Sequence, residues 1–191
     1  VVLGEGFKTL SRLEGSDNRS VRIRAGAAAS LTRLTDWVVE QGASGLEFTA
    51  GIPGSVGGAV AMNAGAWGED MSGVIDTVQL VNHEQKVTVP ASEAVFSYRS
   101  FNDLSEKYRG FVITRVELVL EKGGPEEIRE KMRELRNLRA ASQPAGMPTA
   151  GSFFKNPVQE SAGRLIDEAG LKGLRIGDAE VSRKHANFFV N

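Results

Sequence analysis

The chain has 191 residues, and its 23 Lys and Arg side chains against 24 Asp and Glu give a formal net charge of −1 at neutral pH. This balance lacks the basic excess typical of nucleic-acid binding, so no nucleic-acid partner is expected. The sequence has no run of about eighteen apolar residues and no signal-peptide pattern at its start, so no membrane partner is expected either. Cysteine is absent, which excludes disulfides and thiolate chemistry and favours a cytoplasmic location.

Alternating apolar and basic side chains at residues 21–24 predict a half-buried strand. A helix should follow, because Ser30 is suited to cap its first turn and Gly42 to end it in the left-handed conformation. The buried face of this helix is expected to carry Leu31, Leu34, Trp37 and Val38.

Three further segments show the alternation of strands. Residues 78–81 and 86–89 flank a polar stretch and predict a hairpin, and residues 115–121 predict another strand. Together the three strands predict an antiparallel meander.

The next predicted element is a long helix. Pro125 is suited to its first position, and the helix should run to about Ala141. Its expected buried stripe consists of Ile128, Met132, Leu135 and Leu138. Its solvated surface is expected to carry Arg129, Arg133 and Arg136.

Proline and glycine between residues 142 and 149 predict a connection between two lobes. Beyond it, a short amphipathic helix is expected at residues 162–169, ended by Gly170, and a buried strand at residues 186–190. The chain begins without Met in an apolar strand and ends in another, so we expect the native protein to extend beyond both ends.

Residues 51–68 read GIPGSVGGAVAMNAGAWG, with six glycines in eighteen positions and almost no charge. Glycine lets the backbone approach a ligand closely, and successive N–H groups converge on anionic oxygens, so the segment predicts a nucleotide pyrophosphate site. An ordinary tight turn is the alternative. The segment lacks the G-x-G-x-x-G order of a dinucleotide-binding crossover, and residues 4–9 lack the spacing of a nucleotide-hydrolase phosphate loop.

Two polar clusters with aromatic neighbours are the other candidate sites. Arg99, in the sequence FSYRSF, is suited to hold a carboxylate in two parallel hydrogen bonds, and a surface ion pair is the alternative. Ser152, in the sequence GSFFKNP, is suited to deliver a proton in a dry pocket, and a turn-capping serine is the alternative. His83 and His185 lack the spacing of a metal site, so no metal is expected.

Five blocks of sequence together carry a family resemblance. They are GLEFTAGIPGSVGGAVAMNAGAWG, FSYRSF, AGSFFKNP, AGRLIDEAGLKG and VSRKHANFFVN. In their order and spacing the blocks resemble the UDP-N-acetylenolpyruvoylglucosamine reductases of peptidoglycan synthesis. The short connection before residue 126 is similar to the second type of this family, which lacks an extra tyrosine-bearing loop over the substrate.

The resemblance implies an α+β fold, in which a vanillyl-alcohol-oxidase-type FAD-binding domain is followed by a smaller α+β substrate-binding lobe. Residues 1–14 would be a remnant of the first FAD subdomain. Residues 15–142 would form the second FAD subdomain, an antiparallel sheet with flanking helices. Residues 143–191 would form the substrate-binding lobe without its C-terminal part, and the family's catalytic glutamate would lie beyond Asn191.

The resemblance also assigns site residues by matching motifs. The FAD pyrophosphate contacts carry over to the backbone of Gly51, Ile52, Gly54, Ser55, Gly57 and Gly58, and the flavin contacts to Asn63 and Gly65. Arg99 corresponds to the arginine that polarises the substrate carboxylate, and Ser152 to the serine that protonates the substrate. The substrate-binding positions match Tyr98, Arg139, Lys155 and Asn156. The first glycine loop departs from the family's Gly-x-Gly-Ser-Asn pattern at Phe7 and Lys8, which leaves its pyrophosphate contacts open.

The implied reaction has two halves. NADPH reduces FAD, and flavin N5 then passes hydride to C3 of the enolpyruvyl ether of UDP-N-acetylenolpyruvoylglucosamine, which gives UDP-N-acetylmuramate. A monomer is expected. Two other hypotheses stay open: another flavoenzyme on this scaffold that oxidises a hydroxy acid or a phenol, and a chain that binds nucleotide without activity.

Overall fold

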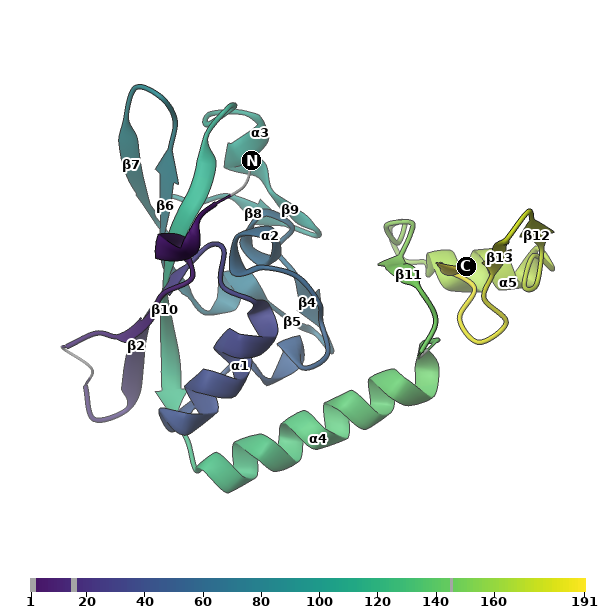
Figure 1. The fold of residues 1–191 in the computed structure, drawn as a ribbon, viewed down its shortest axis with the longest axis horizontal. Coiled ribbons are helices and arrows are strands. Elements are labelled where there is room, and N and C mark those ends of the chain that lie inside the picture. Colours follow the sequence, from purple (N-terminus) through teal and green to yellow (C-terminus); the bar gives the residue numbers. More distant parts are fainter. Residues whose placement is uncertain (1–2, 15–16, 145) are drawn as a thin grey trace. The chain divides into compact units, whose positions relative to one another are not determined.

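An antiparallel sheet forms the centre of the first part of the chain (Figure 1). The structure, a computed structural model, describes residues 3–14, 17–144 and 146–191. Contacts divide the chain into two units, Val1–Leu135 and Arg136–Asn191, and the division falls inside helix α4 (Pro125–Ser142). The predicted lobe boundary after residue 142 coincides with the end of this helix and remains a proposal.

The sheet has the strand order β1-β2-β10-β6-β7 with antiparallel pairs throughout. Its strands are β1 (Leu10–Arg12), β2 (Ser20–Gly26), β10 (Val112–Lys122), β6 (Ile75–Val81) and β7 (Lys86–Pro90), and β3 (Ala43–Ser44) pairs with the end of β10. The hairpin of β6 and β7 is confirmed, but the predicted meander is wrong, because β10 pairs with β2 and β6 instead of β7. Pro90, which cannot donate to a ladder, suits β7 to the edge.

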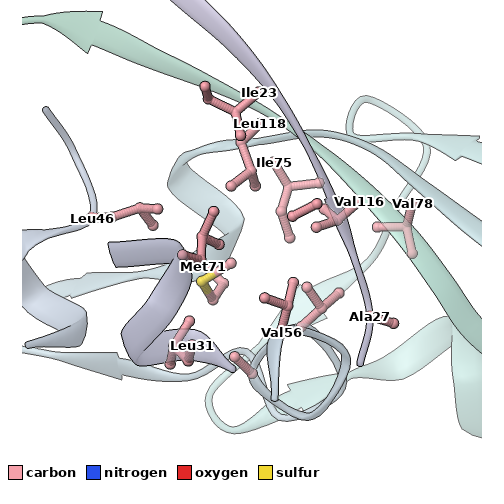
Figure 2. Close-up of a cluster of buried hydrophobic side chains, with 14 of the residues drawn as sticks. Ile23, Ala27, Leu31, Leu46, Val56, Met71, Ile75, Val78, Val116 and Leu118 are labelled. Atoms are coloured by element: carbon pink, nitrogen blue, oxygen red, sulfur yellow. The ribbon is translucent and has the colours of Figure 1, made fainter. Parts of the chain in front are cut away.

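Alternate side chains of the sheet form one side of an apolar core (Figure 2). Ile23 on β2 and Leu118 on β10 belong to the same buried cluster as Val56 and Met71, and each of the four is completely buried. Burying an aliphatic side chain of this size contributes roughly 1.5–3 kcal/mol to folding. The core therefore fixes the segments around residues 56 and 71 against the sheet.

Helix α1 (Leu31–Glu40) begins and ends as predicted. The Ser30 hydroxyl oxygen accepts a hydrogen bond from the Arg33 amide at 3.1 Å, and Gly42 follows the helix with φ +63°. Leu31, Leu34 and Val38 are buried, whereas Trp37 is partly buried.

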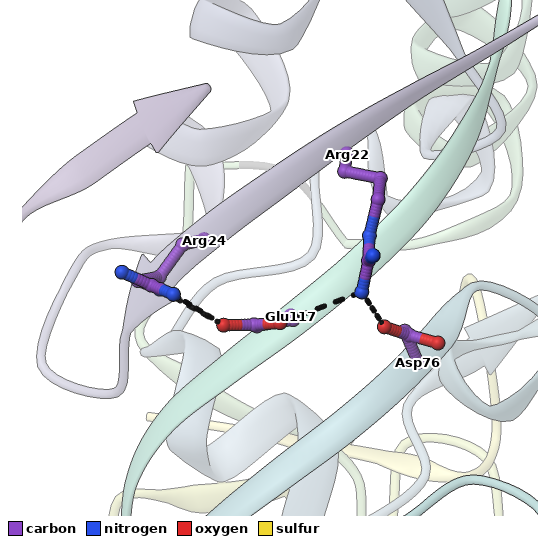
Figure 3. Close-up of polar contacts among 4 residues, drawn as sticks. All are labelled: Arg22, Arg24, Asp76 and Glu117. Carbon is purple, nitrogen blue, oxygen red and sulfur yellow. Dashed lines mark hydrogen bonds and ion pairs between the residues drawn. The ribbon is translucent and has the colours of Figure 1, made fainter. Parts of the chain in front are cut away.

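The opposite face of the sheet carries a charged network on three strands (Figure 3). The Glu117 carboxylate on β10 lies 2.7 Å from Nη2 of Arg24 and 3.7 Å from Nη2 of Arg22, both on β2. Arg22 also pairs with Asp76 on β6. Charges of opposite sign on neighbouring strands stabilise the sheet modestly. The acidic and basic side chains of this network therefore neutralise one another.

Short elements connect the sheet to the glycine-rich segment. They are the 3₁₀ turns η1 (Glu5–Phe7), η2 (Glu47–Thr49) and η3 (Met71–Gly73), helices α2 (Val56–Ala61) and α3 (Asn102–Ser105), and the two-stranded pairs β4 (Gly65–Ala66) with β5 (Glu69–Asp70) and β8 (Phe96–Ser97) with β9 (Ser100–Phe101). An apolar strand was expected at the start of the chain. Residues 1–2 lie outside the described residues, and residues 3–4 are not in a strand.

Helix α4 begins at Pro125 as predicted, and Ile128 and Met132 are buried. The predicted stripe is wrong at its end, because Leu135 is partly buried but Leu138 is 52% exposed. Arg129 pairs with Glu126 three residues earlier, which is the solvated ion pairing expected of this surface. Among the described residues, none of the helices is both long and apolar enough to cross a membrane.

The described residues of the second unit form a sheet in the order β11-β14-β13-β12. Its strands are β11 (Thr149–Ser152), β14 (Phe188–Val190), β13 (Ala179–Val181) and β12 (Arg175–Ile176). Helix α5 (Ala162–Glu168) ends before Gly170, which has φ +71°, as predicted. Of the apolar residues of this helix, Ala162 is buried and Ile166 is partly buried, but Leu165 is 43% exposed.

Candidate functional site

The start of the glycine-rich segment is bound to the turn that follows β2. The Val56 amide donates a hydrogen bond to the Ala29 carbonyl oxygen at 2.9 Å, and the Gly57 amide donates to the Ala27 carbonyl oxygen at the same distance. These bonds fix the first residues of α2 against the end of β2.

The amide groups of this segment fall into two sets. The Gly57 amide is engaged as just described, and the Gly58 amide donates to the Ser55 hydroxyl oxygen at 3.2 Å. Within the described chain, the amides of Gly54 and Ser55 donate no hydrogen bond to protein. Gly51 and Gly54 have φ +80° and +124°, which glycine adopts without strain. Gly54 and Ser55 therefore offer the donors that a pyrophosphate requires.

The glycines of this segment differ in the space that surrounds them. A Cβ on Gly57 would lie 2.9 Å from the Ala27 Cβ, so glycine here permits the close packing of α2 on the turn that follows β2. A Cβ on Gly58 would meet the Ser55 hydroxyl oxygen at 3.3 Å, and a Cβ on Gly54 would meet nothing within 4 Å. The space beside Gly54 is therefore open to a bound group.

Ile52 helps to hold the glycine-rich segment in place. Its amide donates to the Thr49 carbonyl oxygen at 2.8 Å, and its half-buried side chain packs on the core. Any contact of Ile52 with a cofactor would thus use its carbonyl group or its side chain.

The first glycine loop lies against the same turn. The Ala28 amide donates to the Phe7 carbonyl oxygen at 2.9 Å, and the Gly26 amide donates to the Thr9 carbonyl oxygen at 2.8 Å. The Lys8 ammonium group pairs with the Glu5 carboxylate at 2.6 Å. The loop that departs from the family pattern is thus next to the glycine-rich segment, with its lysine engaged by a neighbouring acid.

Arg99 sits at the tip of the β8–β9 hairpin with φ +57°. Its Nη2 donates to the Gly65 carbonyl oxygen at 2.6 Å, and its Nη1 lies 3.4 Å from the Asn63 carbonyl oxygen. Its guanidinium also lies over the half-exposed Tyr98 ring, 4.9 Å from the centroid. Within the described residues no carboxylate pairs with Arg99, so the surface ion pair is not what the structure contains.

Asn63 is 2% exposed and has φ +38°. Its Nδ2 donates to the Ser97 carbonyl oxygen at 3.2 Å, and its Oδ1 accepts from the Ser72 amide at 3.0 Å. The structure therefore brings Asn63, Gly65, Tyr98 and Arg99 into one cluster in the first unit.

Ser152 lies at the end of β11 in the second unit, with an exposed side chain. The next residue, Phe153, donates its amide to the Asn187 carbonyl oxygen at 2.8 Å. The rings of Phe153 and Phe189 are 4.7 Å apart between centroids, and Phe154 meets both at wider angles. Ser152 is thus presented beside an exposed aromatic cluster.

Asn187 is a residue that the motif analysis missed. It is 2% exposed, and it binds both main-chain groups of Phe154: Oδ1 accepts from the amide at 2.9 Å and Nδ2 donates to the carbonyl oxygen at 2.8 Å. An asparagine inside the otherwise apolar run 186–190 was the available signal, because a buried amide requires partners.

The predicted substrate-binding residues of the second unit are on its surface or at its turns. The Asn156 Oδ1 accepts from the Ala162 amide at 3.1 Å and so ties its loop to the start of α5. Lys155 is exposed. Arg139 lies in the last turns of α4, where its Nη1 is 3.5 Å from Oε1 of Gln143. Asn156 retains its amide NH2 group for a ligand.

His185 is packed into the second unit. Its Nδ1 accepts from the Asn187 amide at 3.2 Å, and its ring meets Phe188 edge to face. Burial lowers the pKa of His185 below the usual 6.5. The side chain is therefore neutral at pH 7, as its accepting Nδ1 requires.

A groove of about 680 Å³ lies elsewhere on the first unit. It is lined by Arg19, Ser20, Ser44, Gly45, Phe48, Gly68, Glu69, Asp70, Ser72, Gly73, Val74, Val119, Leu120 and Glu121. None of the predicted cofactor residues is part of this lining.

Two family profiles match the chain. The profile described as the UDP-N-acetylenolpyruvoylglucosamine reductase C-terminal domain matches residues 143–191, and one described as an FAD binding domain matches residues 6–88. The chain belongs to the UDP-N-acetylenolpyruvoylglucosamine reductase family. Family membership and the predicted α+β flavin-binding fold are thereby confirmed.

Curated relatives agree with this assignment. The reductase of Trichlorobacter lovleyi is 47% identical over 97% of this chain and 59% of its own length, and that of Anoxybacillus flavithermus is 41% identical over 100% and 61%. The crystal structure of the Thermus caldophilus reductase is 39% identical with a TM-score of 0.84, covering 98% of this chain and 65% of that one. The chain thus spans about three fifths of the length of the relatives it matches.

Proposed function

We propose that the protein binds FAD and uses NADPH to reduce UDP-N-acetylenolpyruvoylglucosamine to UDP-N-acetylmuramate. The observation that carries this proposal is the cluster in the first unit, where the glycine-rich segment and the Arg99 guanidinium are joined by hydrogen bonds. One segment thus supplies open amides at Gly54 and Ser55 and also holds a cation that no carboxylate of the described residues neutralises.

The residues fit FAD in charge and shape. The unused amides of Gly54 and Ser55 suit a pyrophosphate, and the open space beside Gly54 admits one. FAD, when bound, supplies the hydride that reduces C3 of the enolpyruvyl ether. We assign the pyrophosphate to residues 51–58 and the flavin ring to the vicinity of Asn63 and Gly65.

Arg99 would stabilise the charge that develops on the substrate. Negative charge builds at C2 and on the adjoining carboxylate, and a fixed guanidinium binds this state more strongly than the neutral-ether ground state. Two of its five N–H groups face main-chain carbonyl oxygens, which leaves donors for a carboxylate. Tyr98 would cover the substrate beside it.

Ser152 would deliver the proton to C2. Its exposed position beside Phe153 suits a group that acts on a bound substrate. Arg139, Lys155 and Asn156 would bind the substrate's polar groups in this unit. This mechanism requires both units to serve one substrate, in a protein that we expect to act as a cytoplasmic monomer.

The test is a two-stage assay on the purified protein. We expect visible flavin absorbance, its bleaching by NADPH, and its recovery without oxygen on addition of UDP-N-acetylenolpyruvoylglucosamine. If the flavin absorbance recovers only on addition of the oxidised product of a hydroxy acid, the other flavoenzyme hypothesis is favoured. A protein that takes up no FAD would refute the proposal.

A further inference from the structure

The stretch from Asn63 to Gly65 makes two kinds of contact with the β8–β9 hairpin. The Asn63 side chain donates to the Ser97 carbonyl oxygen at 3.2 Å, in the residue pair that begins the hairpin turn. The main-chain carbonyl oxygens of Asn63 and Gly65 accept from the Arg99 guanidinium at 3.4 and 2.6 Å. Residues 63–65 therefore bind both the backbone of the hairpin at Ser97 and the side chain of Arg99.

Backbone conformation gives an independent sign that this cluster is constrained. Asn63 and Arg99 are two of the four non-glycine residues of the described chain that have positive φ. Arginine rarely adopts this conformation, which persists where surrounding contacts hold it. For Arg99 those contacts are the hydrogen bonds to residues 63–65 and the bond from Asn63 to the hairpin.

The position of Asn63 explains why its amide matters. It is 2% exposed, and its second polar atom, Oδ1, accepts from the Ser72 amide at 3.0 Å. Ser72 belongs to η3, whose Met71 is completely buried in the core. Asn63 therefore connects the tip of the hairpin, where Ser97 and Tyr98 are exposed, to the core-anchored turn η3.

We infer that Asn63 is a positioning residue that sets the Arg99 guanidinium for the substrate carboxylate, rather than one whose main role is to contact the flavin. This inference rests on the proposed function. A hydrogen-bonded guanidinium has one orientation, whereas a released arginine side chain samples many rotamers, and a shift of about 1 Å can cost ~10²-fold in rate.

Asn63→Asp and Asn63→Gly test the inference, because both residues tolerate positive φ. Aspartate keeps the acceptor for the Ser72 amide but loses the donor to Ser97, and glycine loses both. The matched control is Thr49→Val, which removes the buried bonds of Thr49 to Thr35 at 2.6 Å and to the Leu46 carbonyl oxygen, away from the hairpin.

We expect flavin reoxidation by the substrate to slow about 10- to 100-fold in both Asn63 variants, and by a larger factor than reduction by NADPH. In Thr49→Val both rates should be preserved despite a lowered melting temperature. In an Arg99→Ala background, Asn63→Asp should add no further loss, because residues that act through one another are not additive. An equal loss in the two backgrounds would overturn the inference.

Hydrogen exchange supplies a readout without substrate. Amides of residues 96–101 should exchange faster in both Asn63 variants than in the wild-type protein and in Thr49→Val. Unchanged exchange of this segment would overturn the inference, even if the wild-type protein reduced the substrate. Conversely, a wild-type protein that binds no FAD would refute the proposed function, while the exchange result would still decide whether Asn63 holds the hairpin.

Discussion

Two buried asparagines hold the segments that carry the two proposed catalytic residues, but they do so in units with different cores. Asn63 joins the hairpin of Arg99 to η3, so it connects segments that are far apart in sequence. Asn187 binds both main-chain groups of Phe154, two residues after Ser152. Both side chains are 2% exposed.

The surroundings of the two residues differ more than their hydrogen bonds. The first unit has a continuous apolar core from β2, β10, β6, α1 and α2. In the second unit, large apolar residues such as Leu174 and Ile176 are exposed. Arg99 is therefore held by segments that pack on an apolar core, whereas the Ser152 strand depends to a larger extent on the polar contacts of Asn187.

The largest expected effect is that of removing the Ser152 hydroxyl group. Ser152→Ala should slow flavin reoxidation by the substrate ~10²- to 10⁴-fold, because the general acid is lost. Reduction by NADPH should be unaffected. Stopped-flow measurement of each half-reaction checks this, with Ser11→Ala on exposed β1 as the control. Equal slowing of both half-reactions would mean that Ser152 does not act on the substrate.

The next prediction tests the packing of the first unit. Gly57→Ala should lower the free energy of unfolding by ~1–3 kcal/mol, because the new Cβ would lie 2.9 Å from the Ala27 Cβ. Gly58→Ala is the matched substitution, and its Cβ would meet the Ser55 hydroxyl oxygen at 3.3 Å. Denaturant unfolding should rank Gly57→Ala well below Gly58→Ala. A reversed order would show that α2 does not pack against Ala27 as described.

The hydrogen bonds of Asn187 should make a smaller contribution. Asn187→Ala removes two of them and should lower the stability of the second unit by ~1–2 kcal/mol. We expect faster hydrogen exchange at residues 149–154, with the first unit unaffected. If exchange rises equally in both units, the loss is not local to the Ser152 strand.

The smallest effect is a pH dependence of the second unit. Burial lowers the pKa of His185 below the 6.5 of the unfolded chain, so the unfolded state takes up a proton first as the pH falls. The second unit is therefore not destabilised by the titration of His185 above about pH 6.5, and it loses stability as the pH falls below this value. Melting curves of His185→Gln should show a weaker decline in acid than those of the wild-type protein.

Local signals in the sequence predicted much of the fold. Ser30 and Gly42 mark the ends of α1, and Pro125 marks the start of α4, because caps and fixed dihedrals act within a few residues. The place of β10 between β2 and β6 was not predicted, because it depends on pairing between distant segments. The exposure of Leu165 was missed for a similar reason, since periodicity reports an apolar face and not what covers it.

The candidate site was predicted unevenly. Motifs identified Arg99 and the glycine-rich segment, and the structure brings them together. The sequence could not tell that the Gly57 amide is used by the Ala27 carbonyl oxygen, while that of Gly54 is not. The role of Asn187 was missed because its partner, Phe154, lies 33 residues away.

The most direct test of the proposed cofactor site is a titration of the isotope-labelled protein with FAD, followed by its amide and guanidinium NMR signals. We expect the largest shifts at Gly54, Ser55 and Gly65 and at the Arg99 side chain. Shifts concentrated instead at Ser20 and Gly73, in the groove of about 680 Å³, would contradict it.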